Sequence, residues 1–214
     1  MLPVRSADEG NSAFGTAFVV RHDQARTYLV TCAHVVRDVG GDGQVLAGGQ
    51  PASVVAKGSP DGADDIAVLA TDRIAATPMA LGFDAERGRA VSVLGFRSVQ
   101  LGARLLAVEP VDSTLGPQMA LDSPRRRNTA WQLQFDERGL DQGYSGSPIV
   151  DLATEEVVAI AAYRQDERRA IAIAVGGLRA LWPDGLPDLA APVTVAGTEF
   201  VYVPSSPFAM GTGQ

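Results

Sequence analysis

The feature that most constrains the fold is the recurrence of short apolar runs, rich in Val, Ile and Leu, at close intervals along the chain. Gly, Pro, Asp and Asn separate these runs, which include "AFVVR", "TYLVTC", "IAVLAT", "AVSVLGF" and "EVVAIAAY". Runs of this length with turn residues between them indicate β-strands, because amphipathic helices would give longer segments with a period near 3.6 residues. The pattern predicts an all-β sandwich or barrel, and the number of runs fits two β-barrels.

Turn chemistry predicts where some of these strands connect. The polar turn centred on Asp23 and Gln24 predicts a hairpin, and "YRQDERRAIAIAV" repeats that design with a charged tip. A short helix is expected at "GGLRALW", ended by Pro183, and two further prolines downstream mark a linker. We therefore expect a first domain over residues 1–185 and a linker over 186–194.

Composition limits the partners and the compartment. The chain has 214 residues, 46% of them apolar, and a formal net charge of −7. That charge disfavours nucleic acid and anionic membranes as partners, since both require a basic surface, and leaves proteins and peptides open. With Cys32 as its lone cysteine, no signal-peptide pattern at the N-terminus and no membrane-length apolar run, the chain is expected to be cytoplasmic.

The stretch "GYSGSPIV" places Ser145 between two glycines and just ahead of an apolar run. Turns rich in glycine, serine and proline are also common in ordinary loops, so Ser145 is either a nucleophile or a turn residue. A serine that attacks an amide needs a base for its proton, an acid that orients the base, and backbone N–H groups for the oxyanion. If Ser145 is a nucleophile, the rest of the chain must supply these partners.

Two histidines and one acidic pair supply the candidates. His34 follows the buried run "TYLVTC", whereas His22 lies at a hairpin tip, so His34 is the better base and a core histidine is its alternative. Asp65 in "DDIAVL" directly precedes an apolar strand, although such a pair also commonly marks a loop-to-strand boundary. His34, Asp65 and Ser145 occur in the order that chymotrypsin-type triads use.

Four blocks together carry a family resemblance: "FGTAFVVR", "YLVTCAHVV", "DDIAVL" and "GYSGSPIV". They resemble the trypsin/chymotrypsin-like serine peptidases, especially the disulfide-free bacterial branch that includes HtrA-like proteases. The resemblance implies two six-stranded antiparallel β-barrels with the active site in the cleft between them. It also implies that Ser145 is the nucleophile, His34 the base, Asp65 the orienting acid, and that the N–H groups of Gly143 and Ser145 form the oxyanion hole.

The chain departs from the trypsin pattern at several positions. Tyr144 replaces the aspartate with which a freed N-terminal amine pairs in zymogen activation, so the oxyanion loop is expected to be preformed or set by a partner. The expected substrate pocket contains Gly139 where trypsin has an aspartate, and its strands contribute Ala161, Ala162 and Tyr163. This pocket predicts a small or medium apolar residue before the scissile bond. The two alanines also replace a serine that supports the triad aspartate in many relatives.

No metal and no cofactor are expected, because neither Cys32 nor the histidines show metal-ligand spacing. Residues 195–214 include "FVYVPSSPFAMG", which resembles the first hairpin of formylglycine-generating-enzyme-like domains, a C-type-lectin-related fold; a plain tail is the alternative. The sequence thus predicts an intracellular bacterial serine endopeptidase that acts on proteins or peptides and is regulated or targeted by a partner or a fused C-terminal recognition domain. A catalytically silent binding module with the same fold is the alternative.

Overall fold

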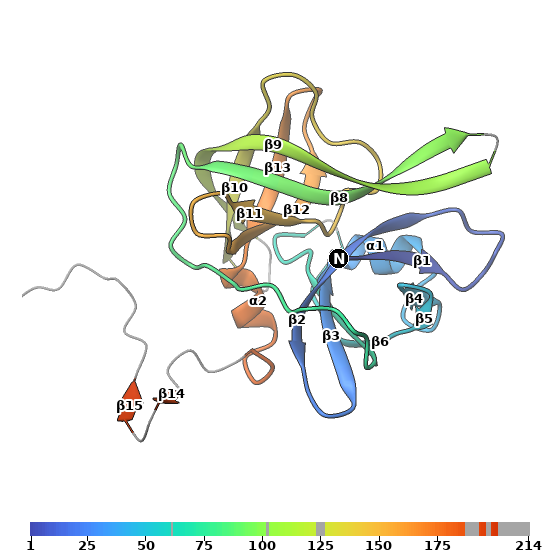
Figure 1. Ribbon diagram of the computed structural model, residues 1–214. Helices are drawn as coiled ribbons and strands as arrows, with labels where there is room; N and C mark the ends of the chain where they lie inside the picture. The colour runs from blue at the N-terminus through green and yellow to red at the C-terminus, as the bar shows by residue number, and fades with distance from the viewer. Residues whose placement is uncertain (61, 102, 123–126, 187–192, 196–197, 201–214) are drawn as a thin grey trace, which may run out of the picture.

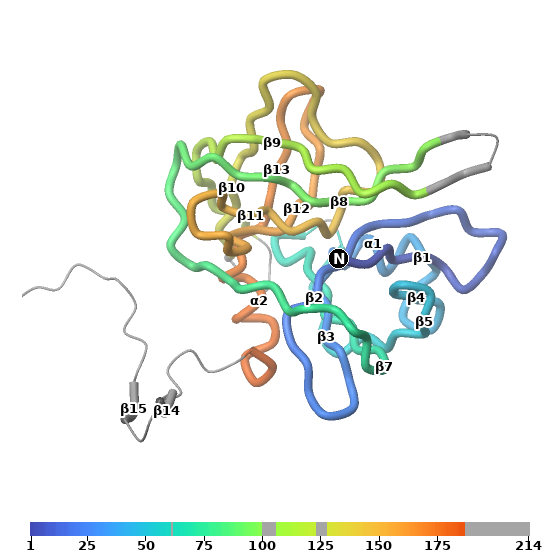
Figure 2. The backbone as a smooth tube through the Cα atoms, viewed as in Figure 1, coloured from blue at the N-terminus to red at the C-terminus, as the bar shows by residue number. Residues whose placement is uncertain are grey.

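The computed structural model describes residues 1–60, 62–101, 103–122, 127–186, 193–195 and 198–200, which form two packed β-structures and two short helices (Figures 1 and 2). The first structure is a seven-stranded antiparallel sheet, and the second is a closed six-stranded antiparallel barrel. This arrangement confirms the all-β, two-barrel expectation. Within the described residues, no helix is long and apolar enough to cross a bilayer.

The first sheet has the strand order β5-β4-β1-β2-β3-β7-β6. Its strands are β1 (Leu2–Ser6), β2 (Phe14–His22), β3 (Arg26–Thr31), β4 (Val45–Ala47), β5 (Gln50–Pro51), β6 (Ser53–Lys57) and β7 (Ala67–Asp72). It has one strand more than expected, because Gly48 and Gly49 adopt positive φ angles of 60° and 82° and turn the chain back on β4 as a tight hairpin. Only Ala52 separates the edge strands β5 and β6, so the sheet curls towards closure.

The second barrel closes in the order β10-β13-β12-β11-β8-β9. Its strands are β8 (Ala90–Leu101), β9 (Ala103–Asp122), β10 (Arg127–Gln134), β11 (Pro148–Asp151), β12 (Val157–Arg164) and β13 (Arg169–Ala174). The helix α2 (Gly176–Leu181) follows β13 where the sequence predicted it, and both predicted hairpins, β2–β3 and β12–β13, are present.

The strands β8 and β9 form a long hairpin that projects beyond the barrel, past β1 (Figure 1). The strand β9 continues through two prolines. Pro110 lies on the part of β9 that pairs with β8, and Pro117 lies where β9 pairs with β10 and the register shifts between Trp131 and Leu133. Edges and bulges are the places where a strand tolerates proline, so β9 runs on through both.

The apolar core explains why β12 is apolar on both faces. Val158 and Ala161 pack inside the barrel with the side chains of β8 and β10, whereas Ile160 packs against the first sheet. Ile173 of β13 and Leu178 of α2 belong to the same cluster as Ile160, the first core cluster, and are fully buried. Burying each such side chain contributes roughly 1.5–3 kcal/mol, so this layer holds the two β-structures together.

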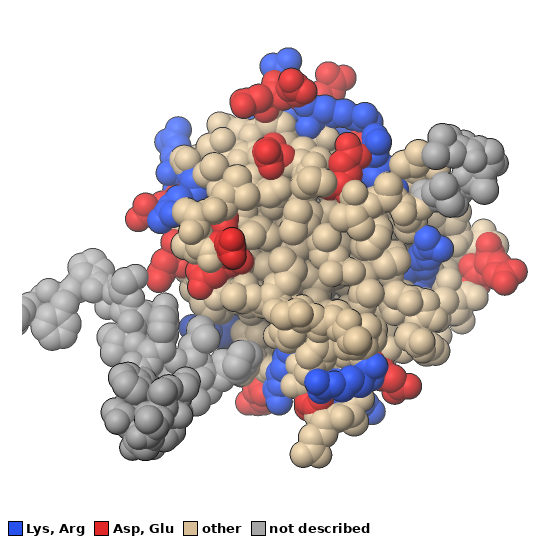
Figure 3. Space-filling model, viewed as in Figure 1, with Lys and Arg blue, Asp and Glu red and all other residues tan. Residues whose placement is uncertain are grey.

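Of the C-terminal region, the structure describes only the backbone pairing of β14 (Val193–Val195) with β15 (Thr198–Phe200). Apart from Leu186, the rest of the expected linker and of the region 195–214 lies outside the described residues. On the face drawn in Figure 3, acidic and basic side chains alternate around the edge, and uncharged residues cover most of the centre. This face therefore presents no continuous basic area of the kind that binds nucleic acid.

Candidate active site

His34 lies in the first turn of a short helix, α1 (Ala33–Asp38), which follows β3 directly. The sequence predicted a strand that ends at His34, but β3 ends at Thr31 and Cys32 is the N-cap residue of α1. Val35 and Val36 bury one side of this helix in the first core cluster. The helix thereby fixes the backbone of His34 and leaves its side chain 13% exposed.

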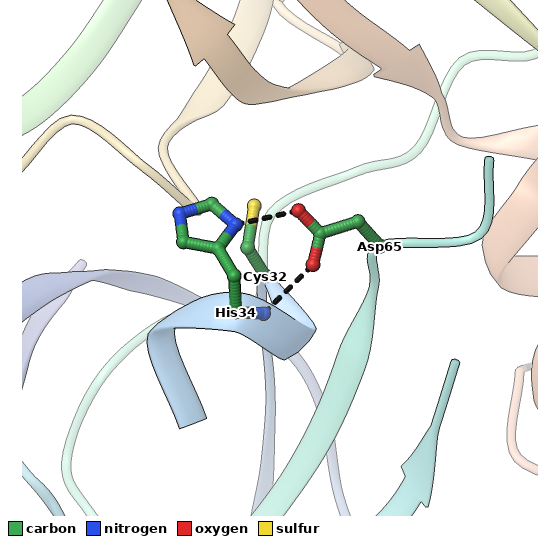
Figure 4. A group of neighbouring side chains, drawn as sticks. All are labelled: Cys32, His34 and Asp65. Atoms are coloured by element: carbon green, nitrogen blue, oxygen red, sulfur yellow. Dashed lines mark hydrogen bonds and ion pairs between the residues drawn. The ribbon is translucent and has the colours of Figure 1, made fainter. Parts of the chain in front are cut away.

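Asp65 is fully buried and binds His34 through both carboxylate oxygens (Figure 4). Its Oδ2 lies 2.5 Å from His34 Nδ1, and its Oδ1 accepts a hydrogen bond of 2.7 Å from the backbone N–H of His34. With the carboxylate as acceptor, Nδ1 carries the proton and Nε2 is left as the basic atom. Ala161 and Ala162 predicted fewer hydrogen-bond supports for Asp65 than in many relatives, and the bond from the backbone N–H of His34 was not foreseen.

The loop before β7 that carries Asp65 is tied to the second barrel by two side chains. Asn128 of β10 donates from Nδ2 to the carbonyl of Ala63 at 2.9 Å, and the Tyr163 hydroxyl donates to the carbonyl of Gly62 at 3.1 Å. Asn128 is buried, so an unmatched amide there would be costly. These bonds fix the position of the aspartate relative to the barrel that contributes Ser145.

Ser145 lies in the turn between β10 and β11, flanked by glycines with left-handed backbone conformations. Gly143 has a φ of 105°, and a Cβ there would lie 2.2 Å from Phe14 Cε2 and 2.4 Å from Phe96 O. Gly146 has a φ of 85°, and a Cβ there would lie 2.2 Å from Thr16 O. Both glycines are therefore required by conformation and by close approach.

Shared hydrogen-bond partners bring the Ser145 turn next to the His34 helix. The carbonyl of Ala161 accepts hydrogen bonds from Gly146 N at 2.8 Å and from Cys32 Sγ at 3.2 Å. Gly146 follows Ser145 directly, and Cys32 precedes His34 by two residues. The structure thus brings together the neighbourhoods of the three residues that the sequence analysis selected.

Some backbone N–H groups of this turn donate hydrogen bonds within the protein and others do not. Gly146 N, Ser147 N and Tyr144 N donate to the carbonyls of Ala161, Tyr144 and Asp141, respectively. By contrast, the N–H groups of Gly143 and Ser145 have no acceptor within the described part of the chain. Two unpaired backbone donors beside a serine can stabilise an anionic oxygen.

Tyr144, which stands where zymogens have an aspartate, is anchored to the second barrel. Its ring is 2% exposed and packs in the barrel core, and its hydroxyl donates to the carbonyl of Glu109 on β9 at 3.0 Å. Burial, with the nearby charge of Glu109, raises the pKa of Tyr144 to about 12. The phenol therefore stays neutral at physiological pH and holds its turn as a hydrogen-bond donor.

The four residues expected to form the substrate pocket take different positions. The N–H of Gly139 donates to the carbonyl of Glu167 at 2.8 Å, which joins it to the β12–β13 turn. Ala161 and Ala162 are buried in the two core clusters. The Tyr163 ring faces the His34 imidazole at an interplanar angle of 27°, with ring centroids 6.0 Å apart. Tyr163 is thus the member of this group that directly flanks the candidate base.

Cys32 is fully buried. Burial, together with the charge of Asp65, raises the pKa of the Cys32 thiol well above its ordinary value. Its sulfur lies within 4.8 Å of ligand atoms of His34 and Asp65, a grouping that the sequence spacing did not reveal. A metal there would have to displace the thiol proton and the 2.5 Å contact between His34 and Asp65. The absence of a metal stays a prediction.

The second histidine has a different environment. His22 Nε2 lies 2.5 Å from the carbonyl of Ala76, and its Nδ1 lies 3.0 Å from Thr27 Oγ1. Both ring nitrogens of His22 are thus engaged at the far end of the β2–β3 hairpin, which agrees with the choice of His34 as candidate base.

Sequence reasoning missed Thr16 and Asn128, which reach the site from β2 and β10. Thr16 is fully buried inside the otherwise apolar run "FGTAFVV", and it donates from Oγ1 to the carbonyl of Gly143 at 2.8 Å. A polar side chain inside an apolar strand is the signal that could have identified it, since buried hydroxyl groups need partners.

A sequence model described as the trypsin-like peptidase domain matches residues 15–160. No protein in the curated set matches the chain.

Solved proteases share the fold at low sequence identity. The active form of the Rv3671c protease from M. tuberculosis is 22% identical, with a TM-score of 0.63 over 87% of this chain and 81% of that one. A serine endoprotease from Yersinia pestis is 20% identical, with a TM-score of 0.58 over 86% of this chain and 63% of that one. An inactivated protease paralogue from the scabies mite is 16% identical, with a TM-score of 0.62 over 84% of this chain and 90% of that one.

Proposed function

This chain belongs to the trypsin-like peptidase domain family, and we propose that it is a serine endopeptidase with Ser145 as nucleophile, His34 as base and Asp65 as orienting acid. The observation that carries the proposal is the pairing of His34 with Asp65. The carboxylate binds both the ring nitrogen and the backbone N–H of one histidine, at 2.5 and 2.7 Å. A merely structural histidine has no need of a fully buried carboxylate that fixes its tautomer.

In the proposed reaction, Ser145 Oγ attacks the carbonyl carbon of the scissile peptide bond while His34 Nε2 accepts the hydroxyl proton. The carbonyl electron pair moves onto oxygen, and the N–H groups of Gly143 and Ser145 donate to this oxyanion. When the oxyanion collapses, the C–N bond breaks and the His34 imidazolium gives its proton to the leaving amine. Water then cleaves the acyl-enzyme by the same sequence of proton transfers.

Asp65 contributes by stabilising the imidazolium that forms during attack. It is fully buried, so its attraction to the imidazolium is screened less than it would be in water. The 2.5 Å contact to Nδ1 also opposes rotation of the ring, which keeps Nε2 on the side of the ring away from Asp65 (Figure 4).

The proposed substrate is a protein or a peptide with a small or medium apolar residue before the scissile bond. Gly139 offers no charge at the position where trypsin binds a basic side chain, and the buried Ala161 and Ala162 support an apolar pocket. Profiling with a peptide library tests this preference, and cleavage mainly after basic or acidic residues would refute it.

We also propose a cytoplasmic location, since a chain with one cysteine cannot form an internal disulfide, which favours a reducing compartment. A C-terminal recognition domain that begins near residue 195 and directs the peptidase to its target belongs to the same proposal. Its support is the likeness of "FVYVPSSPFAMG" to formylglycine-generating-enzyme-like domains.

Labelling with a fluorophosphonate probe, followed by mass spectrometry of the adduct, tests the proposed nucleophile. The expected result is one adduct on Ser145, lost in Ser145→Ala and retained in Ser147→Ala, the matched control two residues away. If folded protein stays unlabelled with and without candidate activators, the chain is a silent binding module. If Ser145 is labelled but no peptide is cleaved, the chain is an esterase or acyl transferase.

A further inference from the structure

Thr16 of β2 makes four hydrogen bonds although it is fully buried. Its N–H donates to the carbonyl of Ser145 at 2.9 Å, and its Oγ1 donates to the carbonyl of Gly143 at 2.8 Å. The same Oγ1 accepts from the N–H of Phe96 on β8 at 3.0 Å, and the carbonyl of Thr16 accepts from Thr31 Oγ1 at 2.7 Å. One residue of the first sheet therefore contacts both the nucleophile turn and a strand of the second barrel.

The two carbonyls that Thr16 binds belong to the residues on either side of Tyr144. They also belong to the two residues whose N–H groups are the proposed oxyanion donors. Inside the turn, the support on the N-terminal side is weak, because Tyr144 N lies 3.5 Å from the carbonyl of Asp141. Glycine at position 143 has wide backbone freedom, so its conformation has to be restrained from outside the turn.

A hydroxyl group is the chemical requirement at this position. It must accept a hydrogen bond from the Phe96 N–H and donate one to the Gly143 carbonyl at the same time. A serine or threonine hydroxyl does both with one atom, whereas a valine of the same shape does neither. Loss of the hydroxyl would leave a buried N–H and a buried C=O without their partner, both next to the nucleophile.

We propose that Thr16 is a positioning residue for the oxyanion donors, which its hydroxyl fixes by linking β8 to the Gly143 carbonyl. This inference rests on the proposed function and deepens it, because Thr16 touches no reacting atom. The restraint acts where negative charge develops in the transition state, so its loss should lower kcat and leave KM nearly unchanged.

Thr27 on β3 supplies a matched control. It is also fully buried, and its Oγ1 also bridges two groups, the N–H of Ile74 at 2.9 Å and His22 Nδ1 at 3.0 Å. It pairs with His22 next to the hairpin turn, whereas Thr16 lies near the opposite end of β2. A general effect of losing a buried bridging hydroxyl should therefore appear equally in both threonines.

The experiment measures kcat and KM on a cleaved peptide, with the free energy of unfolding, for the wild type, Thr16→Val, Thr16→Ser and Thr27→Val. Because removal of one oxyanion donor costs about 100- to 1,000-fold in kcat, we expect a loss of roughly 10- to 100-fold in Thr16→Val, where both donors remain but are misplaced. Thr16→Ser should restore most of kcat. Thr27→Val should lose comparable stability and keep its kcat.

Unchanged kcat in folded Thr16→Val, an equal loss in Thr27→Val, or failure of Thr16→Ser to restore kcat would each overturn the inference. If Thr16→Val does not fold, Thr16→Cys replaces it, because its weaker thiol donor predicts an intermediate kcat and an unchanged kcat again overturns the idea. Failure of the wild type to label or to cleave would instead overturn the proposed function, and this inference with it.

Discussion

Replacement of Asp65 by asparagine tests the proposed site with almost no change in shape. The backbone N–H of His34 donates to Oδ1 at 2.7 Å, so that position must remain an acceptor and the amide oxygen of the asparagine must occupy it. The NH2 group then faces His34 Nδ1 in place of Oδ2 and donates a hydrogen bond to it. Nδ1 becomes the acceptor, and the proton moves to Nε2, the atom that should be the base.

The expected loss follows from this tautomer. A base that already carries a proton cannot accept one from Ser145, and the imidazolium also loses its counter-charge. The same exchange in a serine triad lowers kcat on the order of 10⁴-fold, which corresponds to roughly 5 kcal/mol of transition-state stabilisation. We therefore expect a loss of that order in kcat for Asp65→Asn, with KM and the unfolding midpoint in urea little changed.

The assay compares steady-state cleavage and fluorophosphonate labelling in Asp65→Asn and in Asp64→Asn. Asp64 is the matched control, because it is also buried and its Oδ1 accepts from the backbone N–H of Ser59, a bond that asparagine keeps. Its kcat should stay within about twofold of the wild type. A folded Asp65→Asn enzyme with near-normal kcat would refute the role of Asp65, and equal losses in both variants would point to a general structural effect.

Two further predictions concern buried groups near the site. Ser147→Ala should stabilise the protein by about 1 kcal/mol in urea unfolding, because Ser147 Oγ is buried with no hydrogen-bond partner in the described structure; a lower stability would show that the hydroxyl is satisfied. Cys32 should resist thiol reagents at neutral pH until the protein unfolds, because burial raises its pKa. The pKa of the Cys32 thiol is higher in the folded than in the unfolded protein, so its contribution to the free energy of unfolding is complete below the pKa of the unfolded thiol and is lost as pH rises above about 9. Cys32→Ala should therefore reduce the fall in the free energy of unfolding at alkaline pH, and an unchanged fall would contradict the assignment.

Local patterns in the sequence were sufficient to predict the fold class and to choose the site residues. The turn around Ser145 could be recognised because Gly143 and Gly146 need backbone conformations that other residues resist, which leaves a visible signature. His34 and Asp65 could be selected because each is a polar residue next to an apolar run of the sequence. The structure shows their side chains paired, whereas their catalytic roles stay predictions.

What the sequence could not predict depends on contacts between distant segments. The bond from Thr16 to Gly143 joins residues 127 positions apart, and nothing in either neighbourhood encodes the partner. The same holds for the tie between Asn128 and Ala63, which are 65 positions apart. The length of the β8–β9 hairpin was missed for a local reason, because Pro110 and Pro117 indicate strand ends unless the edge and the bulge are known.

Each β-structure is built from one continuous part of the chain, β1 to β7 within residues 2–72 and β8 to β13 within residues 90–174. A ribosome therefore releases the acid–base pair, His34 and Asp65, long before it adds Ser145. Under the proposed function, a growing chain first contains the base without the nucleophile. Once Ser145 has been added, its turn still lacks the hydrogen bonds to Thr16 until the second β-structure docks on the first. Peptidase activity would therefore arise only after both β-structures have docked, so that an incomplete chain would cleave neither itself nor nearby proteins.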